Sequence, residues 1–325
     1  MKAIVYHNYG SPDVLQCEEI EKPTLTDDEV LIKVRAASVN ALDWRMMRGK
    51  PLFARLMMGG LRKPKNTRPG VDLAGEVEAV GRNVTQFKPG DAVFGVCQGA
   101  FAEYVCAIED KLALKPANIS FEDAAAVPVA AITALQGLRD KGRIQRGQKV
   151  LVDGASGGVG TFAVQIATSF GAEVTAVCST RNVETARSIG ADHVIDYSRE
   201  DFTQSGQRYD LIMAANAYHS IFDYRRALSK DGIYVGAGGG WAQILQAMLL
   251  GPLLSLIGRR KMCFFIAKIN QKDLVLLKDL LEAGKLVPVI DRRYPLSDVA
   301  GAIRYLEEGH ARGKVVITLE SNNKT

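Results

Sequence analysis

The stretch Lys149-Val-Leu-Val-Asp-Gly-Ala-Ser-Gly-Gly-Val-Gly160 decides the fold of this 325-residue chain. Its apolar start predicts a short buried β-strand, its glycines a tight turn, and the apolar periodicity of residues 161–170 a helix. Glycines let the backbone approach a ligand, and the first N–H groups of a helix bind anions. With a second strand predicted at 173–178, this order is typical of a site for a dinucleotide pyrophosphate. We therefore expect cofactor contacts from Ala155, Ser156, Gly157, Gly158, Val159 and Gly160.

Two polar residues follow the second predicted strand, where such sites bind the adenosine ribose. An NAD-preferring site usually places Asp or Glu there to bond both ribose hydroxyls. This chain has Ser179 and Arg181 instead. A hydroxyl and a guanidinium bind a 2′-phosphate, which a carboxylate repels. The sequence thus favours NADPH over NADH, with an ordinary solvated Arg181 at a helix start as the alternative.

The whole chain has the composition of a soluble globular protein of two domains or one large domain. A net charge of +5, spread along the sequence, does not indicate nucleic-acid binding. The N-terminus enters a strand pattern directly, so we expect no targeting segment. The cysteines show no CxxC pair and predict a reducing cytoplasm; they are Cys17, Cys97, Cys106, Cys178 and Cys263.

The patterning changes near residue 122. Before it, short alternating runs predict strands at 3–6, 29–37, 75–80, 92–96 and 102–106. Ser120-Phe-Glu-Asp123 then resembles a capping box before a helical stretch. Strands predicted at 149–152, 173–178, 193–196, 211–214 and 232–236 alternate with helices, which indicates a right-handed parallel α/β sheet. The last segment predicts a helix at 272–283, a strand at 287–290, a helix at 296–308 and a strand at 314–319.

Residues 241–257 are nearly uncharged and strongly apolar, and Arg259-Arg-Lys261 follows them. The stretch is short for a transmembrane span, and Gly251-Pro252 is expected to interrupt a helix. We interpret it as a helical lid or subunit-contact segment over an apolar pocket. An interfacial membrane anchor, with its basic residues against anionic lipid, is the alternative.

Several phrases together resemble the zinc-independent quinone oxidoreductase branch of the medium-chain dehydrogenase/reductase superfamily. With the glycine stretch, they occur in the family's order over nearly the whole chain: Ser38-Val-Asn-Ala-Leu-Asp43, Pro69-Gly-Val-Asp-Leu-Ala-Gly-Glu-Val-Glu-Ala-Val-Gly81, Phe87-Lys-Pro-Gly-Asp-Ala-Val-Phe94, Phe101-Ala-Glu-Tyr-Val105, Gly190-Ala-Asp-His-Val-Ile-Asp-Tyr197 and Gly313-Lys-Val-Val-Ile317. The resemblance implies a GroES-like β-barrel domain from residues 1–122 and 268–325. It implies a Rossmann domain with a doubly wound parallel sheet from 123–267, and a cofactor cleft between the two.

The resemblance also bears on zinc. The zinc alcohol dehydrogenases of this superfamily have a Cys where this chain has Asn40, and a His-Glu pair where it has Val71-Asp72. The four-cysteine lobe of those enzymes is also missing here, because only four residues separate Cys97 from the next predicted strand and they contain no cysteine. Neither a catalytic nor a structural ligand set remains, so we expect no zinc. Without a Lewis acid, a quinone or a conjugated enone is a better hydride acceptor than a simple carbonyl.

The resemblance assigns further site residues. It implies that Asn40 is a catalytic amide donor beside the nicotinamide; a turn residue bonding its own backbone is the alternative. Tyr197 matches a tyrosine near the 2′-phosphate. The remaining implied cofactor contacts are Thr133, Asn216, Gly236, Gly238, Phe265, Ala267 and Lys314. Of these, Thr133 is equally compatible with packing and Lys314 with a strand-flanking charge. No proton donor is identified; Tyr218, His219 and Trp44 are candidates only by their predicted loops.

Three functions are compatible with these features. The leading one is an NADPH-dependent reductase of quinones or α,β-unsaturated carbonyls. The second is an enoyl-thioester or 2-alkenal reductase that holds a large anionic substrate with Arg or Lys of residues 45–65. The third is a low-turnover NADPH-binding protein that acts through residues 241–261. Residues 44–68 and 241–261 are expanded and are expected to wall the pocket. The resemblance also implies a homodimer that pairs through the edge strand of the Rossmann sheet, which places residues 232–236 and their surroundings near the interface.

Overall fold

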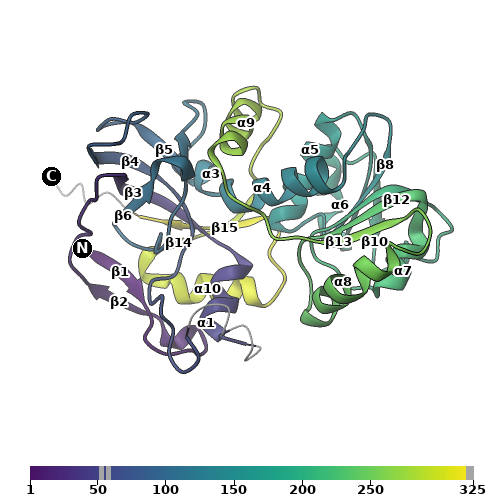
Figure 1. Ribbon diagram of the computed structural model, residues 1–325, viewed down its shortest axis with the longest axis horizontal. Helices are drawn as coiled ribbons and strands as arrows, with labels where there is room; N and C mark the ends of the chain where they lie inside the picture. Colours follow the sequence, from purple (N-terminus) through teal and green to yellow (C-terminus); the bar gives the residue numbers. More distant parts are fainter. Residues whose placement is uncertain (51–54, 56–59, 320–325) are drawn as a thin grey trace. The chain divides into compact units, whose positions relative to one another are not determined.

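The computed structural model describes residues 1–50, 55 and 60–319, and the chain divides into two compact units (Figure 1). Unit one consists of Met1–Val129, Ile269–Glu282 and Ile290–Thr325, and unit two of Ala130–Lys268 and Ala283–Val289. The predicted domain boundaries stay a prediction, because compactness alone does not show that either unit folds independently.

Unit one is a GroES-like barrel of mainly antiparallel strands. Its seven-stranded sheet has the order β14-β15-β3-β4-β5-β7, β6 pairs with β3, and β1 and β2 form a separate pair. The strands are β1 (Lys2–Val5), β2 (Gln16–Glu19), β3 (Glu29–Val39), β4 (Asp72–Val80), β5 (Ala92–Val96), β6 (Tyr104–Ile108), β7 (Leu112–Leu114), β14 (Ile290–Pro295) and β15 (Lys314–Thr318). Because β15 pairs antiparallel with β3, the two ends of the chain share one core.

The helices of unit one whose bounds are described are α1 (Ala41–Arg48), α3 (Phe121–Ala125), α9 (Gln271–Glu282) and α10 (Val299–Glu307). The capping box predicted at the start of α3 is confirmed, since Ser120 and Asp123 bond each other's backbone N–H groups. Helix α10 buries Val299, Ala302 and Ile303, which are spaced to share one helical face, in the core of the barrel.

Unit two is a Rossmann sheet of six parallel strands in the order β10-β9-β8-β11-β12-β13. The strands are β8 (Lys149–Asp153), β9 (Glu173–Cys178), β10 (His193–Asp196), β11 (Tyr209–Ala214), β12 (Leu228–Gly236) and β13 (Lys261–Phe264); the helices are α4 (Pro128–Gln136), α5 (Gly158–Ser169), α6 (Val183–Ser188), α7 (Ile221–Ala227) and α8 (Trp241–Leu254). The strand order reverses between β8 and β11. Ligands of such sheets bind beyond the carboxyl ends of the strands at that point.

Two predictions about strands are wrong. The strand predicted at 287–290 starts only at Ile290, as β14. Before it, the backbone of Val287 is bonded by a side chain, since Val287 N–H donates to Gln165 Oε1 at 2.8 Å and Gln165 Nε2 donates to the Val287 carbonyl at 3.0 Å. The sheet edge is not formed by 232–236, because β12 lies between β11 and β13. The edge strand beside β12 is β13, whose four residues follow a long apolar run that hides its strand pattern in the sequence; β10 forms the other edge.

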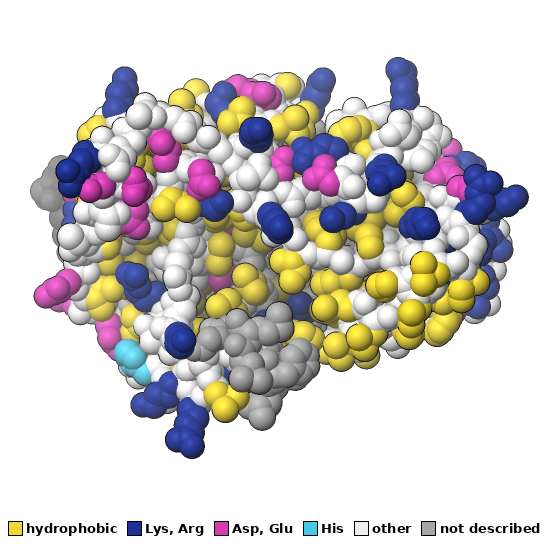
Figure 2. All heavy atoms as spheres, viewed as in Figure 1, with side chains coloured by type: hydrophobic (Ala, Val, Ile, Leu, Met, Phe, Trp, Pro, Cys, Tyr) yellow, Lys and Arg dark blue, Asp and Glu magenta, His cyan; other side chains and the backbone are white. Residues whose placement is uncertain are grey.

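Helix α8 has two apolar faces. Ile244, Ala247 and Gly251 are buried on one face, and Gly251 allows close contact because a Cβ there would lie 2.9 Å from the Met262 carbonyl oxygen of β13. The opposite face is exposed, and Figure 2 shows apolar side chains gathered over this helix; they are Leu245, Met248, Leu249 and Leu253, continued by Leu256 and Ile257. The expected interruption at Gly251-Pro252 does not occur, since the helix continues to Leu254. Among the described residues, no helix is both long and apolar enough to cross a membrane.

Candidate active site

The glycine loop of unit two turns from β8 into α5. Gly154 has a φ of +76°, which favours glycine, and a Cβ on Gly160 would lie 2.0 Å from the Gly154 carbonyl oxygen. The fold therefore requires glycine at both positions. Gly157 is different, because its φ of −82° suits any residue and a Cβ there would meet only the Gly154 carbonyl oxygen, at 3.5 Å. Besides the chain neighbours of Gly157, no other described residue comes within 4 Å of this position at the N-terminus of α5, so the loop fits a bound pyrophosphate.

The residues predicted at the adenosine end lie on neighbouring strand ends. Ser179 follows β9 and accepts a hydrogen bond from Asn182 Nδ2 at 3.1 Å. Tyr197 follows β10, its side chain is 61% exposed, and its N–H donates to the Cys178 carbonyl at 3.0 Å. Arg181 is exposed, and its guanidinium has no hydrogen-bond or ion-pair partner among the described residues. The structure thus brings all three side chains to the same corner of the sheet.

A carboxylate lies at this corner too. Asp196 ends β10 and accepts hydrogen bonds from Thr180 Oγ1 at 2.5 Å and from Ser198 Oγ at 2.7 Å. These hydroxyl contacts, with that of Thr180 the largest, lower the pKa of Asp196. Its charge is partly balanced by the Arg199 guanidinium at 3.4 Å.

The other predicted cofactor residues of unit two gather at the carboxyl edge of the sheet. Gly154 and Gly238 both pack closely against the residues that follow β11. A Cβ on Gly154 would lie 2.8 Å from Asn216 Cβ, and a Cβ on Gly238 would lie 2.3 Å from the Ala215 carbonyl oxygen. Phe265 donates its N–H to the Gly236 carbonyl at 3.1 Å. Helix α4, which carries Thr133, is tied to the chain beyond Ala267 because the side chain of Gln136 exchanges two hydrogen bonds with the backbone of Lys268, at 2.8 and 3.0 Å.

A buried pair beneath the loop was not predicted. Tyr224 OH donates to Asp153 Oδ2, and the Asp153 carbonyl accepts the N–H of Ala215 at 2.9 Å. Burial raises the pKa of Asp153 to about 6. The pair fixes the end of β8, from which the loop starts. No sequence signal points to it, because the two side chains are 71 residues apart.

Unit one contains a buried polar cluster around Asn40. Lys314 Nζ donates to Asn40 Oδ1 at 2.8 Å and lies 3.2 Å from Asp72 Oδ2, with the two charged residues 3% and 0% exposed. Asn40 Nδ2 donates to Asp72 Oδ2 at 2.9 Å, and Ser38 Oγ donates to the same oxygen at 2.8 Å. The second contact of Asn40 Nδ2, to the Ser38 carbonyl, is long at 3.5 Å. The amide of Asn40 is therefore fixed mainly by charged partners, besides its long contact with the Ser38 carbonyl and its part in the capping box of α1.

Asp43 extends this cluster toward the surface. Its carboxylate accepts the N–H of Asn40 at 2.7 Å and that of Gly70 at 3.2 Å. Burial raises its pKa to about 7, opposed by these hydrogen bonds and by the charge of Lys314. Asp43 lies in α1, a helix that the sequence analysis did not predict.

The cluster disfavours a metal at the positions compared with the zinc enzymes. Asn40 and Asp72 both bond the ammonium group of Lys314, and that positive charge would repel a divalent cation. In the described part of the chain, no three His, Cys, Asp or Glu side chains come together as metal ligands. The predicted contact of Lys314 with the cofactor stays a prediction, because Lys314 lies in unit one.

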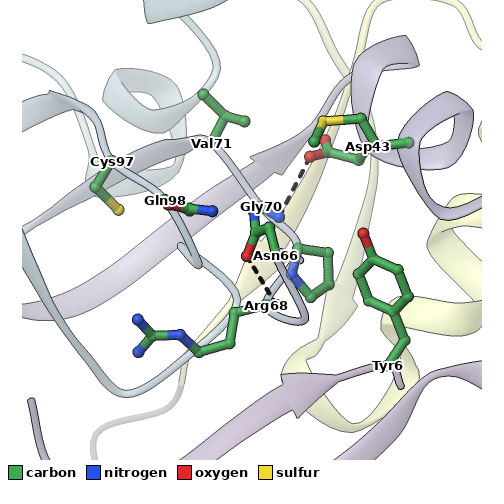
Figure 3. A pocket seen from close by; sticks show the side chains of 10 residues that line it. Tyr6, Asp43, Asn66, Arg68, Gly70, Val71, Cys97 and Gln98 are labelled. Carbon is green, nitrogen blue, oxygen red and sulfur yellow. Dashed lines mark hydrogen bonds between the residues drawn. The ribbon is translucent and has the colours of Figure 1, made fainter. Parts of the chain in front are cut away.

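A cavity of about 200 Å³ adjoins Asp43 and is open to solvent on one side; all of its lining residues belong to unit one (Figure 3). It is lined by Tyr6, Asp43, Met46, Asn66, Arg68, Pro69, Gly70, Val71, Cys97 and Gln98. Gly70 and Val71 directly precede Asp72, so the cavity and the Asn40 cluster share one segment of backbone. Of the pocket wall predicted at residues 44–68, Met46, Asn66 and Arg68 line this cavity, whereas 51–54 and 56–59 lie outside the described residues.

The candidate proton donors differ in their surroundings. His219 of unit two packs edge-on against Phe202, with ring centroids 4.9 Å apart, as expected for a structural histidine. Tyr218 is exposed, and Trp44 in unit one is half-buried. None of them is assigned as a donor.

Comparisons with known proteins agree with this architecture. Residues 26–117 match the family described as alcohol dehydrogenase GroES-like domain, and residues 189–317 that described as zinc-binding dehydrogenase. A 2-methylene-furan-3-one reductase of Solanum lycopersicum is 38% identical over 98% of this chain and 79% of its own length. An NADPH-dependent alkenal/one oxidoreductase, chloroplastic, of Arabidopsis thaliana is 36% identical with the same coverage.

A solved structure is similar over the same extent. That of a quinone oxidoreductase from Coxiella burnetii is 29% identical, with a TM-score of 0.84 over 98% of this chain and 99% of that one. The order of motifs, the two folds and the relatives agree. The chain therefore belongs to the medium-chain dehydrogenase/reductase superfamily, in its zinc-independent quinone oxidoreductase branch.

Proposed function

We propose that this protein is an NADPH-dependent, zinc-independent reductase of quinones or α,β-unsaturated carbonyl compounds. The observation that carries the proposal is the open space beside Gly157. The fold does not require glycine at this position, so the missing side chain leaves room for a ligand. When bound there, the dinucleotide supplies a hydride from its nicotinamide ring. The names of the tomato and Arabidopsis relatives support an activated alkene as the acceptor.

Asn40 is the proposed catalytic residue. One N–H of its amide is held by Asp72, while the other makes only the 3.5 Å contact with the Ser38 carbonyl. That second N–H is available to donate to the oxygen on which negative charge develops after hydride addition. Lys314 bonds the amide oxygen and so keeps the N–H groups on the opposite side. Lys314 and Asp72 are thus positioning residues.

The preference for NADPH rests on the corner formed by Ser179, Arg181 and Tyr197. The unpartnered guanidinium of Arg181 is the group suited to a 2′-phosphate, because a charged pair of this kind is the strongest contact available there. Asp196 stays ionised and opposes this phosphate, and the Arg199 guanidinium at 3.4 Å partly balances its charge. Arg181 is therefore the group on which the proposed preference depends.

The cofactor proposal is tested with Arg181→Ala. We expect the ratio of kcat/KM for NADPH to that for NADH to fall about tenfold or more, and 2′,5′-ADP to bind correspondingly more weakly. Arg187→Ala is the matched control, because Arg187 is exposed on the following helix and pairs with Glu184. An unchanged cofactor preference in Arg181→Ala would refute the assignment.

The reaction is tested by NADPH oxidation against quinones, 2-alkenals, alkenones and enoyl-coenzyme A. Turnover of quinones or enones supports the proposal, and preference for enoyl-coenzyme A would favour the thioester reductase. Tight NADPH binding without turnover of any acceptor would instead favour a low-turnover binding protein acting through residues 241–261.

We also propose a homodimer, formed through unit two. Strand β13 is an edge of its sheet, and the exposed apolar face of α8 lies beside it. Both features are liabilities in a monomer and are removed when a second copy covers them. The cytoplasmic location stays a prediction from the cysteine pattern, while the Arabidopsis relative is named chloroplastic.

A further inference from the structure

We infer that the cavity beside Gly70 and Val71 binds a carboxylate of the substrate through Arg68, so that the enzyme selects acceptors carrying an acidic group. The inference rests on the proposed reductase activity and names its substrate class. It concerns residues of unit one, which adjoin the segment that holds Asn40.

Arg68 is fixed in place but lacks a counter-charge. Its stem packs on Gly99, where a Cβ would lie 3.1 Å from Arg68 Cβ and 3.5 Å from its Nε. The side chain is half-buried, and the guanidinium makes no hydrogen bond or ion pair with the described residues. A guanidinium removed from water is stabilised by a partner, and its planar fork matches a carboxylate with two parallel hydrogen bonds.

The other groups that line the cavity leave Arg68 as its dominant charge. Burial raises the pKa of the Cys97 thiol, and it raises that of Tyr6 to about 12, so both are neutral at pH 7. Asp43 is the acidic residue of the lining, and its oxygens point to the N–H groups of Asn40 and Gly70. In Figure 3, Asp43 and Arg68 lie on opposite sides of Gly70.

Neutral donors complete the recognition surface. The side chains of Asn66 and Gln98 line the cavity with Arg68. Asn66 Oδ1 accepts the backbone N–H of Arg68 at 3.1 Å. This contact turns the acceptor of Asn66 toward the backbone and leaves its NH₂ group for a ligand. An anion in the cavity would therefore meet N–H donors of both residues besides the guanidinium.

The volume limits the ligand. About 200 Å³ is similar to cavities that hold a single benzene ring, at ~150 Å³. A carboxylate on a short carbon chain fits such a space. The cavity thus accommodates small acidic enones.

The test compares trans-4-oxo-2-pentenoate with its methyl ester, which share one enone and differ in charge. We expect the wild-type enzyme to show a kcat/KM for the acid about tenfold or more above that for the ester. Arg68→Met should reduce this ratio to near one, and Arg68→Lys, which keeps the stem and charge, should restore part of it. Lys65→Met is the matched control, because Lys65 is an exposed cation of the same segment outside the cavity.

The outcomes separate the inference from the reductase proposal. Reduction of the ester without preference for the acid, or an equal loss for both in Arg68→Met, would overturn the inference and leave the activity intact. If neither compound is reduced, calorimetric binding of the saturated 4-oxopentanoate decides the matter. Binding to the wild-type protein that Arg68→Met loses and Arg68→Lys keeps supports the carboxylate site, and absence of binding overturns it.

Discussion

Replacing Gly157 by alanine isolates the role of the cofactor loop from its folding. The backbone at Gly157, with φ −82° and ψ 174°, suits alanine, and the new Cβ would contact only one oxygen at 3.5 Å. Alanine is a poorer N-cap than glycine by some tenths of a kcal/mol, and it gains about 0.4–1 kcal/mol by restricting the unfolded chain. These effects largely cancel, so the free energy of unfolding should change by less than about 1 kcal/mol.

Binding should respond differently to the same substitution. The methyl group would occupy the space facing the N-terminus of α5, and overpacking of this kind costs ~1–3 kcal/mol. The dissociation constant of NADPH should therefore rise by roughly 5- to 150-fold. Because the pyrophosphate is common to both cofactors, NADH should lose the same factor.

The assay is a fluorescence titration of NADPH, paired with urea denaturation of each variant. Gly160→Ala provides the contrast, since its Cβ would lie 2.0 Å from the Gly154 carbonyl oxygen and should lower stability itself. An NADPH affinity of Gly157→Ala equal to that of the wild type would show that the space is not the pyrophosphate site.

Three further predictions concern the rest of the chain. The pKa of Asp43 is raised from 3.8 to about 7, so the stability it contributes is present below about pH 4 and is lost as the pH rises to 7. The midpoint of urea denaturation should therefore fall between pH 4 and 7 in the wild type, and Asp43→Asn should flatten this fall. An unchanged slope in the variant would contradict the prediction. Lys314→Met should cost ~3–5 kcal/mol by leaving Asp72 buried and unpaired, with Asp72→Asn in the same chain recovering part of the loss on denaturation; no recovery would argue against the ion pair. Leu249→Glu, at a side chain 68% exposed on α8, should lower the molar mass measured by light scattering, whereas Val287→Glu should not; equal masses would reject the proposed interface.

Local chemistry explains which elements were predictable. The strand, turn and helix around the glycine loop follow from residues close in sequence, and the structure has them at Lys149–Asp153 and Gly158–Ser169. The Ser120 cap is equally local. Helix α1 was missed because it has only eight residues, too few to show a clear periodicity; its start is fixed by the contact between Asp43 and the Asn40 N–H.

The candidate site divides in the same way. The glycines, Ser179 and Arg181 could be predicted as site residues because their residue types are dictated by backbone approach and by charge, which the sequence displays directly; their contacts with the cofactor stay predictions. The partners of Asn40 were not found, since Lys314 and Asp72 reach it from positions 274 and 32 residues away. Arg68 likewise had no signal beyond lying in a basic segment.

By itself, the sequence determined the two-part architecture, the anion-binding loop and the absence of the zinc enzymes' ligand residues at their usual positions. Only the tertiary structure decided what replaces those ligands: a buried ion pair that orients an amide, beside a cavity with one uncompensated guanidinium. The physical reason is that backbone conformation and helix-end charges depend on neighbours in the chain. The energetic state of a buried polar group depends on which distant groups surround it, and folding alone brings these together.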